Sequence, residues 1–271
     1  MTLWEHLAEL RRRLIYCLLT VAAGCLLAWE GREQILAFLV KPFADAWRAK
    51  GIPGQVTLHF ATPGAAFVAY FELAMLGGFL LSTPMLFYQA WRFVAPGLYA
   101  REKRYVVPFV LSSTVLFVGG GLFGWRAAFP IAFEYFLSLS GTLQGQGVAI
   151  VPTVMMGDYL SFVAFMLLAF GIVFEIPVFI LFLALAGIVN YLHLIYYGRW
   201  FVLGAFIVAA IVTPPDVTSQ VLVAIPMCVL YAASIVLAYF FGPKPTAEQR
   251  RRYSWRKKRA QAEAGGEPGG G

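Results

Sequence analysis

The chain has 271 residues, of which 60% are hydrophobic and only 13% are charged. A soluble protein carries about 25% charged residues, so this composition excludes an ordinary soluble core and indicates a polytopic membrane protein. The net charge of +7 does not indicate a nucleic-acid partner, because eight of the 21 basic residues follow the last apolar run, between positions 244 and 259. No aromatic and basic binding module accompanies them, and such a cluster suits the surface of an anionic lipid bilayer.

Six apolar segments predict an all-α fold with six transmembrane helices, since a helix needs about 20 apolar residues to cross about 30 Å of hydrocarbon. We expect these spans at residues 14–30, 68–92, 105–126, 157–187, 198–213 and 218–241. The fifth is the shortest, about 24 Å at 1.5 Å per residue, which predicts local thinning of the bilayer or shielding by partner helices. We expect short interfacial helices in the connecting segments 32–67 and 127–156, which are rich in aromatic residues.

The basic residues predict the orientation of the chain in the membrane. With these spans, 16 Lys and Arg residues lie on the side of the N-terminus and five lie on the other side. Positive residues favour the cytoplasmic side, so we expect both termini to be cytoplasmic in a multi-pass protein of the inner membrane. Residues 1–241 are expected to form one membrane domain, and residues 242–271 a basic, disordered cytoplasmic tail.

The prolines, cysteines and histidines indicate the shape of the bundle and whether it contains disulfides or a metal. Four prolines fall within predicted spans, where each removes a helical hydrogen bond and permits a kink, so we expect a kinked, concave bundle; they are Pro84, Pro108, Pro177 and Pro226. The three cysteines lie inside apolar runs, and the three histidines are isolated from any cluster with metal-ligand spacing. We therefore expect no disulfide framework, no metal and no cofactor.

Two acidic residues lie at the predicted cytoplasmic face. Glu9 precedes Arg11, Arg12 and Arg13 on the first helix, and Glu102 lies in the loop after the second span. Glu9 and Arg13 are spaced for a helical ion pair, which is one interpretation of Glu9. The alternative is that Glu9 and Glu102 face a partner's cations, since guanidinium groups match carboxylates through bidentate hydrogen bonds.

Five segments in this order resemble the TatC subunit of the twin-arginine protein translocase: HLAELRRRL, WRFVAPGLYAREKR, GDYLSFV, FGIVFEIPV and TPPDVTSQ. The similarity covers residues 5 to about 241. It implies a receptor on the cytoplasmic face that binds the twin-arginine signal peptides of folded precursor proteins. It also implies a translocase driven by the proton motive force, self-association in a multimeric complex, and the single-span partners TatA and TatB or one TatA-like protein.

The resemblance assigns roles to individual residues. Glu9 and Glu102 would hold the two signal-peptide arginines, and the surrounding surface would comprise Arg11, Phe93, Pro96, Leu98, Tyr99 and Arg104. Partner-helix docking or the exported hairpins would involve Pro42, Pro215, Asp216 and Gln220, and Glu175 would be the intramembrane polar site. The chain departs from the family pattern at Ala65, where many members have Glu, and at Glu72, where a basic residue is common.

Glu175 lies in the middle of an apolar span, where a carboxylate is costly and usually faces protein or water. We expect it to line a partly hydrated face and to bond to a polar group of a partner helix or an inserted signal peptide, with Gly171 leaving room beside it. An internal structural hydrogen bond is the alternative. A proton-coupled small-solute transporter using Glu175 as a relay is the alternative function; a membrane enzyme is disfavoured because no HExxH or GxSxG motif is present.

Overall fold

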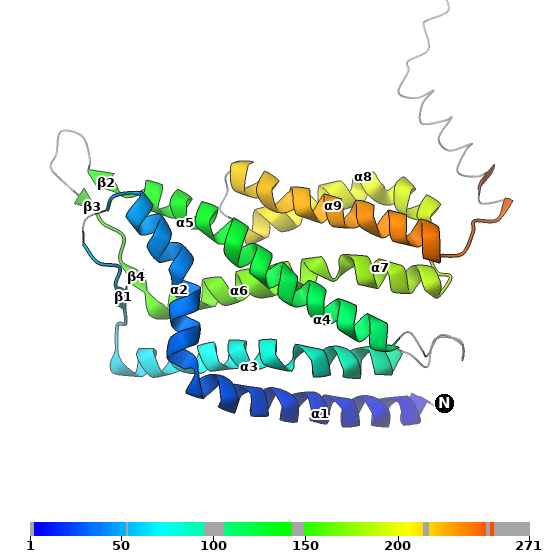
Figure 1. Ribbon diagram of the computed structural model, residues 1–271, viewed down its shortest axis with the longest axis horizontal. Coiled ribbons are helices and arrows are strands. Elements are labelled where there is room, and N and C mark those ends of the chain that lie inside the picture. The colour runs from blue at the N-terminus through cyan, green and yellow to red at the C-terminus, as the bar shows by residue number, and fades with distance from the viewer. Residues whose placement is uncertain are drawn as a thin grey trace, which may run out of the picture. The chain divides into compact units, whose positions relative to one another are not determined.

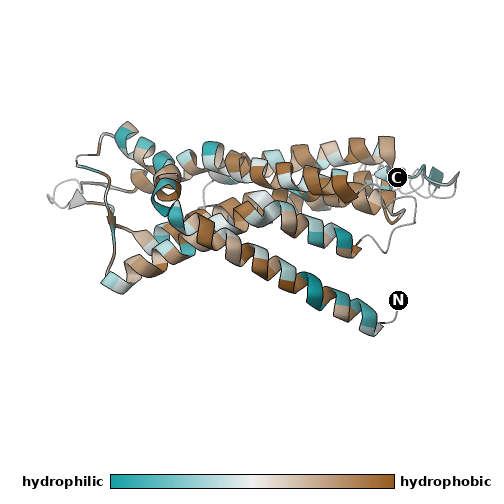
Figure 2. Cartoon of the chain, turned by 60° about the horizontal axis from the view of Figure 1, so that its bottom comes forward, coloured by the Kyte–Doolittle hydropathy of each residue, from teal (hydrophilic) through white to brown (hydrophobic). Residues whose placement is uncertain are grey.

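The computed structural model describes residues 3–52, 54–94, 106–142, 149–213, 217–247 and 250–251. Within these residues, six helical stretches are long enough and apolar enough to cross a membrane, as the sequence predicts. The described part of the chain is almost entirely helical (Figure 1), and the apolar colour runs along the long helices while the N-terminal end of the first helix is hydrophilic (Figure 2). The all-α fold with six spans is confirmed. The chain forms two compact units: residues 1–175 with 209–223, and residues 176–208 with 224–271.

The first unit begins with two long helices that run antiparallel to each other. Helix α1 spans Leu3–Glu30 and helix α3 spans Pro63–Val94, about 42 Å and 48 Å at 1.5 Å per residue. Both exceed the hydrocarbon thickness of about 30 Å, so their ends extend beyond it. The first turns of α1 and the last turns of α3 lie together at one end of the pair (Figure 1); we call this the inner end, and the opposite end the outer end.

Glycines allow the antiparallel helices to approach closely. A Cβ added at Gly78 of α3 would lie 2.7 Å from the Cα of Cys25 on α1, and one added at Gly24 would lie 2.7 Å from the hydroxyl oxygen of Ser82. Small residues at helix interfaces let backbones approach in a membrane, where packing replaces the hydrophobic effect as the force between helices. The Ser82 hydroxyl also donates a hydrogen bond of 3.0 Å to the Thr20 carbonyl.

At the outer end, helix α2 (Arg32–Ala49) turns away from α1 at Gly31 and packs on α5 (Phe129–Ser138) and α6 (Met156–Phe174) (Figure 1). An aromatic cluster holds it there. The Phe43 ring contacts Phe133 of α5 and Tyr159 of α6, and the Tyr159 hydroxyl donates a 2.8 Å hydrogen bond to the Leu39 carbonyl. The predicted helix in segment 32–67 is thus present, whereas the helix in segment 127–156 is not a separate one but the continuation of the third span.

The third span is longer than predicted. Helix α4 (Val106–Phe123) continues through a π-helical turn, η3 (Gly124–Ala128), into α5 (Phe129–Ser138) without interruption. In the described part of the chain, four two-residue strands that the sequence does not predict accompany the helices: β1 (Leu58–His59) pairs in parallel with β4 (Val154–Met155), and β2 (Gly141–Thr142) pairs antiparallel with β3 (Ala149–Ile150).

The fourth span is interrupted at Glu175. Helix α6 runs over Met156–Phe174 and helix α7 over Ile176–Leu185. The cause is Pro177, which has no N–H to donate to the Val173 carbonyl and whose ring crowds that carbonyl. Pro177 is therefore at a break, as expected, whereas Pro108 lies in the first turn of α4, where a missing N–H costs nothing and no kink is required.

The second unit contains α7, most of α8 (Tyr191–Val212) and most of α9 (Val217–Phe241). Phe201 and Tyr231 stack with ring centroids 3.9 Å apart, and the Tyr231 hydroxyl donates a 2.7 Å hydrogen bond to the Leu194 carbonyl. The prediction of a short fifth span is wrong. Helix α8 has 22 residues, about 33 Å, because the aromatic stretch from Tyr191 to Arg199 continues the helix and does not form a loop. Thinning of the bilayer is not required.

Candidate functional site

A buried polar site joins α1 and α3 at the inner end. Arg13 donates from Nε to Glu9 Oε1 over 3.1 Å, and its Nη2 forms an ion pair with the same oxygen. Its Nη1 donates to Gln89 Oε1 of α3 over 3.3 Å. The spacing of four residues places Glu9 and Arg13 on one face of α1, and that face is the one packed on α3. The helical ion pair considered from the sequence is therefore present, and it is extended by a third polar group.

The site is shielded from solvent to an unusual degree for charged groups. Arg13 is 8% exposed and Gln89 is 6% exposed, while the side chain of Glu9 is 13% exposed. The second carboxylate oxygen, Glu9 Oε2, is buried and has no hydrogen-bond partner among the residues that the structure describes. A charged oxygen that is buried without a donor is costly, so Glu9 is prepared to accept a further cationic donor.

Phe93 lies beside this site. Its ring stacks on the His6 imidazole with centroids 4.4 Å apart and an angle of 19° between the planes. His6 is three residues before Glu9 and shares its face of α1, so the stack forms a wall one turn away from the carboxylate. Arg11, by contrast, is exposed and points to the opposite side of the helix, because two residues correspond to about 200° of rotation.

Several predicted site residues lie outside the described residues; they are Pro96, Leu98, Tyr99, Glu102, Arg104, Pro215 and Asp216. The described chain stops at Val94, directly after Phe93, and resumes at Val106, the first residue of α4. The end of α3 and the start of α4 both lie at the inner end (Figure 1).

Glu175 caps the C-terminal end of α6, and its backbone N–H donates to the Ile172 carbonyl over 3.1 Å. Its carboxyl group hydrogen bonds to the side chain of Ser113 on α4, a residue that is completely buried. The Ser113 hydroxyl oxygen accepts a 2.9 Å hydrogen bond from Trp91 Nε1 on α3. A polar chain thus connects three helices of the first unit, and one oxygen, Glu175 Oε1, is buried with no hydrogen-bond partner among the described residues.

The expected space beside Gly171 is occupied. A Cβ at Gly171 would lie 2.7 Å from the Phe117 ring of α4, so the glycine admits that ring and not a partner side chain or water. The prediction failed because helical geometry gives the direction of a side chain and not the neighbour that fills the space.

The remaining predicted positions lie elsewhere. Pro42 is buried inside α2, not in a loop, and Gln220 lies half-buried in the first turn of α9. Ala65 is in the first turn of α3, where its N–H is bonded to the hydroxyl of Thr62 over 3.3 Å. Glu72 accepts a long hydrogen bond of 3.5 Å from Ser161 of α6. The structure thus provides a hydrogen-bond donor for Glu72, the acidic residue at which this chain departs from the family pattern.

Sequence reasoning missed Gln89, His6, Ser113 and Trp91. Gln89 could have been identified from the sequence, because an amide within the apolar segment MLFYQAW needs a hydrogen-bond partner on another helix. Serine and tryptophan are common in membrane spans and gave no comparable signal. Among the described residues no three His, Cys, Asp or Glu side chains gather where they could hold a metal ion.

The family model described as Sec-independent protein translocase protein (TatC) matches residues 5–226. The TatC proteins of Desulforapulum autotrophicum and Koribacter versatilis are 39% and 36% identical over 90% and 92% of this chain, and the matches cover 87% and 89% of those proteins. A crystal structure described as the twin arginine translocase receptor TatC superimposes with a TM-score of 0.69 and 33% identity, covering 86% of this chain and 97% of that chain.

Six apolar helices and an aligned translocase fold define the class of protein: a multi-pass membrane protein of a protein-translocation system. More particularly, the chain belongs to the TatC family of Sec-independent protein translocase proteins. The resemblance drawn from the five sequence motifs is confirmed.

Proposed function

We propose that this chain is the receptor subunit of a twin-arginine translocase and that it binds a pair of signal-peptide arginines at the inner end of α1 and α3. The observation that carries this proposal is the buried Glu9 carboxylate, which has one oxygen bonded to Arg13 and one without a donor among the described residues. A second guanidinium group fits the free oxygen, and charge-assisted hydrogen bonds are the strongest that a receptor can offer a cationic peptide.

Glu102 supplies the second acid in this proposal. Two acids then match two adjacent arginines, and the surrounding surface comprises Phe93, Pro96, Leu98, Tyr99 and Arg104. Arg11, which points away from Glu9 on α1, belongs to the exposed basic face of the same helix. The described wall of His6 and Phe93 supports this arrangement, since stacked rings beside a carboxylate accept the flat guanidinium group by cation–π contact.

The cellular setting follows from the same proposal. The inner end faces the cytoplasm, both termini are cytoplasmic, and residues 1–241 form the domain in the cytoplasmic membrane, with residues 242–271 as a basic tail. The excess of basic residues on this side supports the orientation. Arg199 lies within α8 and not in a loop. When Arg199 is left out of the count, the basic residues on the side of the N-terminus still clearly outnumber those on the other side.

The partners in this proposal are TatA and TatB, or one TatA-like protein, together with further copies of this chain. Pro42, Pro215, Asp216 and Gln220 belong to the segments that contact them, and Glu175 is the polar group to which a partner helix or an inserted signal peptide binds. The buried Glu175 Oε1, which lacks a described partner, supports this role. The chain acts by binding, without bond-making catalysis, and the proton motive force drives movement of the folded cargo.

The alternative of a small-solute transporter is not supported. The relatives and the matched structure are translocase proteins. Within the described residues, the side chain bonded to Glu175 is the neutral Ser113, whereas a proton relay needs further titratable groups in line.

Photo-crosslinking tests the receptor role. A photo-reactive phenylalanine at Phe93 keeps the aromatic wall and leaves Glu9 unchanged; the same probe at Phe71, which is exposed at the outer end of α3, is the control. We expect crosslinks to a twin-arginine signal peptide from position 93 and not from position 71, and their loss with a twin-lysine peptide. Equal labelling from both positions, or indifference to the lysine exchange, contradicts the site.

A further inference from the structure

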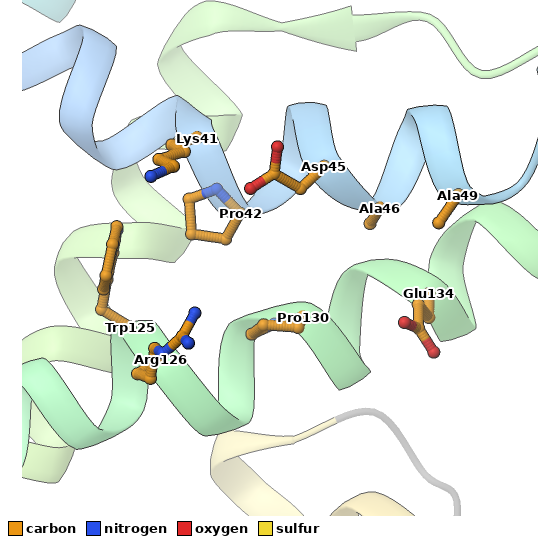
Figure 3. A pocket seen from close by; sticks show the side chains of 9 residues that line it. All are labelled: Lys41, Pro42, Asp45, Ala46, Ala49, Trp125, Arg126, Pro130 and Glu134. Carbon is orange, nitrogen blue, oxygen red and sulfur yellow. The ribbon is translucent and has the colours of Figure 1, made fainter.

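A cavity at the outer end has charged residues that play no part in the proposed function, which assigns a role to Pro42 alone among the residues lining the cavity. It has a volume of about 290 Å³ and lies between α2 and the stretch formed by η3 and α5 (Figure 3). Its lining is rich in charge of both signs: two cations, Lys41 and Arg126, and two acids, Asp45 and Glu134. This size is at the lower end of small-molecule sites, so it suits a compact polar group and not a folded protein segment.

A proline builds one wall of this cavity. Pro42 cannot donate a hydrogen bond to the Phe38 carbonyl one turn earlier, and that carbonyl instead accepts a 3.1 Å hydrogen bond from Trp125 Nε1 of η3. The Trp125 and Phe38 rings also stack, with centroids 4.3 Å apart and an angle of 9°. The contact fixes Trp125 at one end of the cavity (Figure 3), so the wall is rigid.

The cavity lies at the level of lipid headgroups. The 20 residues from Val106 to Trp125 carry no charge, which corresponds to about 30 Å of helix, the thickness of the hydrocarbon. Apolar side chains on this stretch are exposed, including Leu111, Val115 and Leu122. Arg126 is the first charged residue beyond them, and a tryptophan directly before it is typical of the membrane interface.

The charges are separated along the direction that leads out of the membrane. Figure 3 shows the Lys41 and Arg126 side chains near the Trp125 end and Glu134 at the other end. Glu134 follows Arg126 by eight residues, about 12 Å further along the helix. Asp45 is bonded to Arg48 over 3.3 Å, whereas the other three charged groups form no ion pair within the described part of the chain.

We propose that this cavity binds the headgroup of a zwitterionic phospholipid that carries a primary ammonium group. Lys41 and Arg126 hold the phosphate, which lies next to the hydrocarbon, and Glu134 accepts hydrogen bonds from the ammonium group, which lies further out. The order of the protein charges matches the order of charges in such a headgroup. Guanidinium and ammonium groups are strong phosphate donors, and basic pockets between membrane helices are known to select lipid headgroups.

The other lipid classes fit less well. A purely anionic headgroup offers nothing to Glu134, and a trimethylated headgroup has no N–H to donate to it. The site thus predicts a preference for the phosphoethanolamine headgroup over both.

Native mass spectrometry of the full chain with equal amounts of phosphatidylethanolamine, phosphatidylcholine and phosphatidylglycerol tests this. We expect phosphatidylethanolamine to be retained about tenfold more than the others, the effect of one charge-assisted hydrogen bond. The double variant Lys41→Gln/Arg126→Gln should lose retention of all three. Glu134→Gln should lose only the preference for the primary ammonium.

Glu33→Gln, on α2, and Lys50→Gln, directly after α2, are matched controls, since both residues are exposed and neither lines the cavity. Soluble glycerophosphoethanolamine should compete with the lipid, which distinguishes headgroup recognition from a general layer of bound lipid. Equal retention of the three lipids, equal losses in the control variants, or no competition by the soluble headgroup overturns the proposal. Thermal unfolding of each variant identifies a loss of fold, and Glu134→Gln, at an exposed position, still tests the ammonium contact in that case.

Discussion

Replacing Arg13 by glutamine separates two roles of Glu9. If Glu9 only serves to hold Arg13 on α3, then losing either partner damages the site in the same way. If Glu9 receives a signal-peptide arginine at its free oxygen, the positive charge of Arg13 on the other oxygen weakens that attraction, and the two variants have opposite effects. Arg13→Gln should tighten binding of a twin-arginine peptide, and Glu9→Gln should weaken it.

The magnitudes follow from the contacts of Glu9. Water and salt screen ion pairs near the membrane surface, so removing the positive charge of Arg13 beside Glu9 should tighten peptide binding by only about fivefold. Loss of the carboxylate removes a charge-assisted hydrogen bond to the peptide, which should weaken binding by about 10- to 150-fold.

Fluorescence anisotropy of a labelled peptide with the purified chain in nanodiscs measures both effects. Arg12→Gln is the matched control, because Arg12 is exposed and its loss changes the net charge by the same amount; we expect its effect to stay within about twofold. Thermal unfolding of each variant shows whether the α1–α3 pair is intact. Weaker binding by a folded Arg13→Gln variant, similar to that of Glu9→Gln, refutes the reasoning.

Other predictions test the rest of the structure. Glu175→Gln should keep the bond to Ser113 and the thermal stability but reduce export, whereas Glu175→Ala should reduce both; normal export by both variants excludes a functional role. Gly78→Val should lower stability by about 1–3 kcal/mol through overpacking, while Gly119→Val, at an uncrowded position, should not; equal melting temperatures contradict the close approach of α1 and α3. Trp125→Phe should cost about 1 kcal/mol by removing the donor to a backbone carbonyl, and less in a Pro42→Ala background, where a new backbone N–H at position 42 serves that carbonyl; equal costs in both backgrounds rule this account out.

The number and type of the membrane helices could be predicted because hydrocarbon requires long apolar segments with satisfied backbones. Their ends could not. Residues 191–197 contain few charges and several aromatics, a composition that suits either an interfacial loop or more helix, and α8 continues through them. The effect of each proline could not be predicted either. Pro177 interrupts a span, whereas Pro108 lies in the first turn of α4, where it requires no kink.

The candidate site was partly predictable. The Glu9–Arg13 pair follows from helical spacing alone. The contact with Gln89 joins residues 76 positions apart, and the register between two helices depends on the packing of Gly24 and Gly78, which one sequence does not reveal. The contact of Ser113 with Glu175 likewise depends on how two helices pack, which one sequence does not reveal.

The affinity of a twin-arginine peptide for the double variant Glu9→Gln/Glu102→Gln tests the central claim most directly, with a twin-lysine peptide measured alongside at low ionic strength. The account predicts that the native chain prefers arginine to lysine by about tenfold or more, because bidentate guanidinium contacts are lost with lysine, and that the double variant binds both peptides equally weakly. A folded double variant that retains native affinity and the preference for arginine contradicts it.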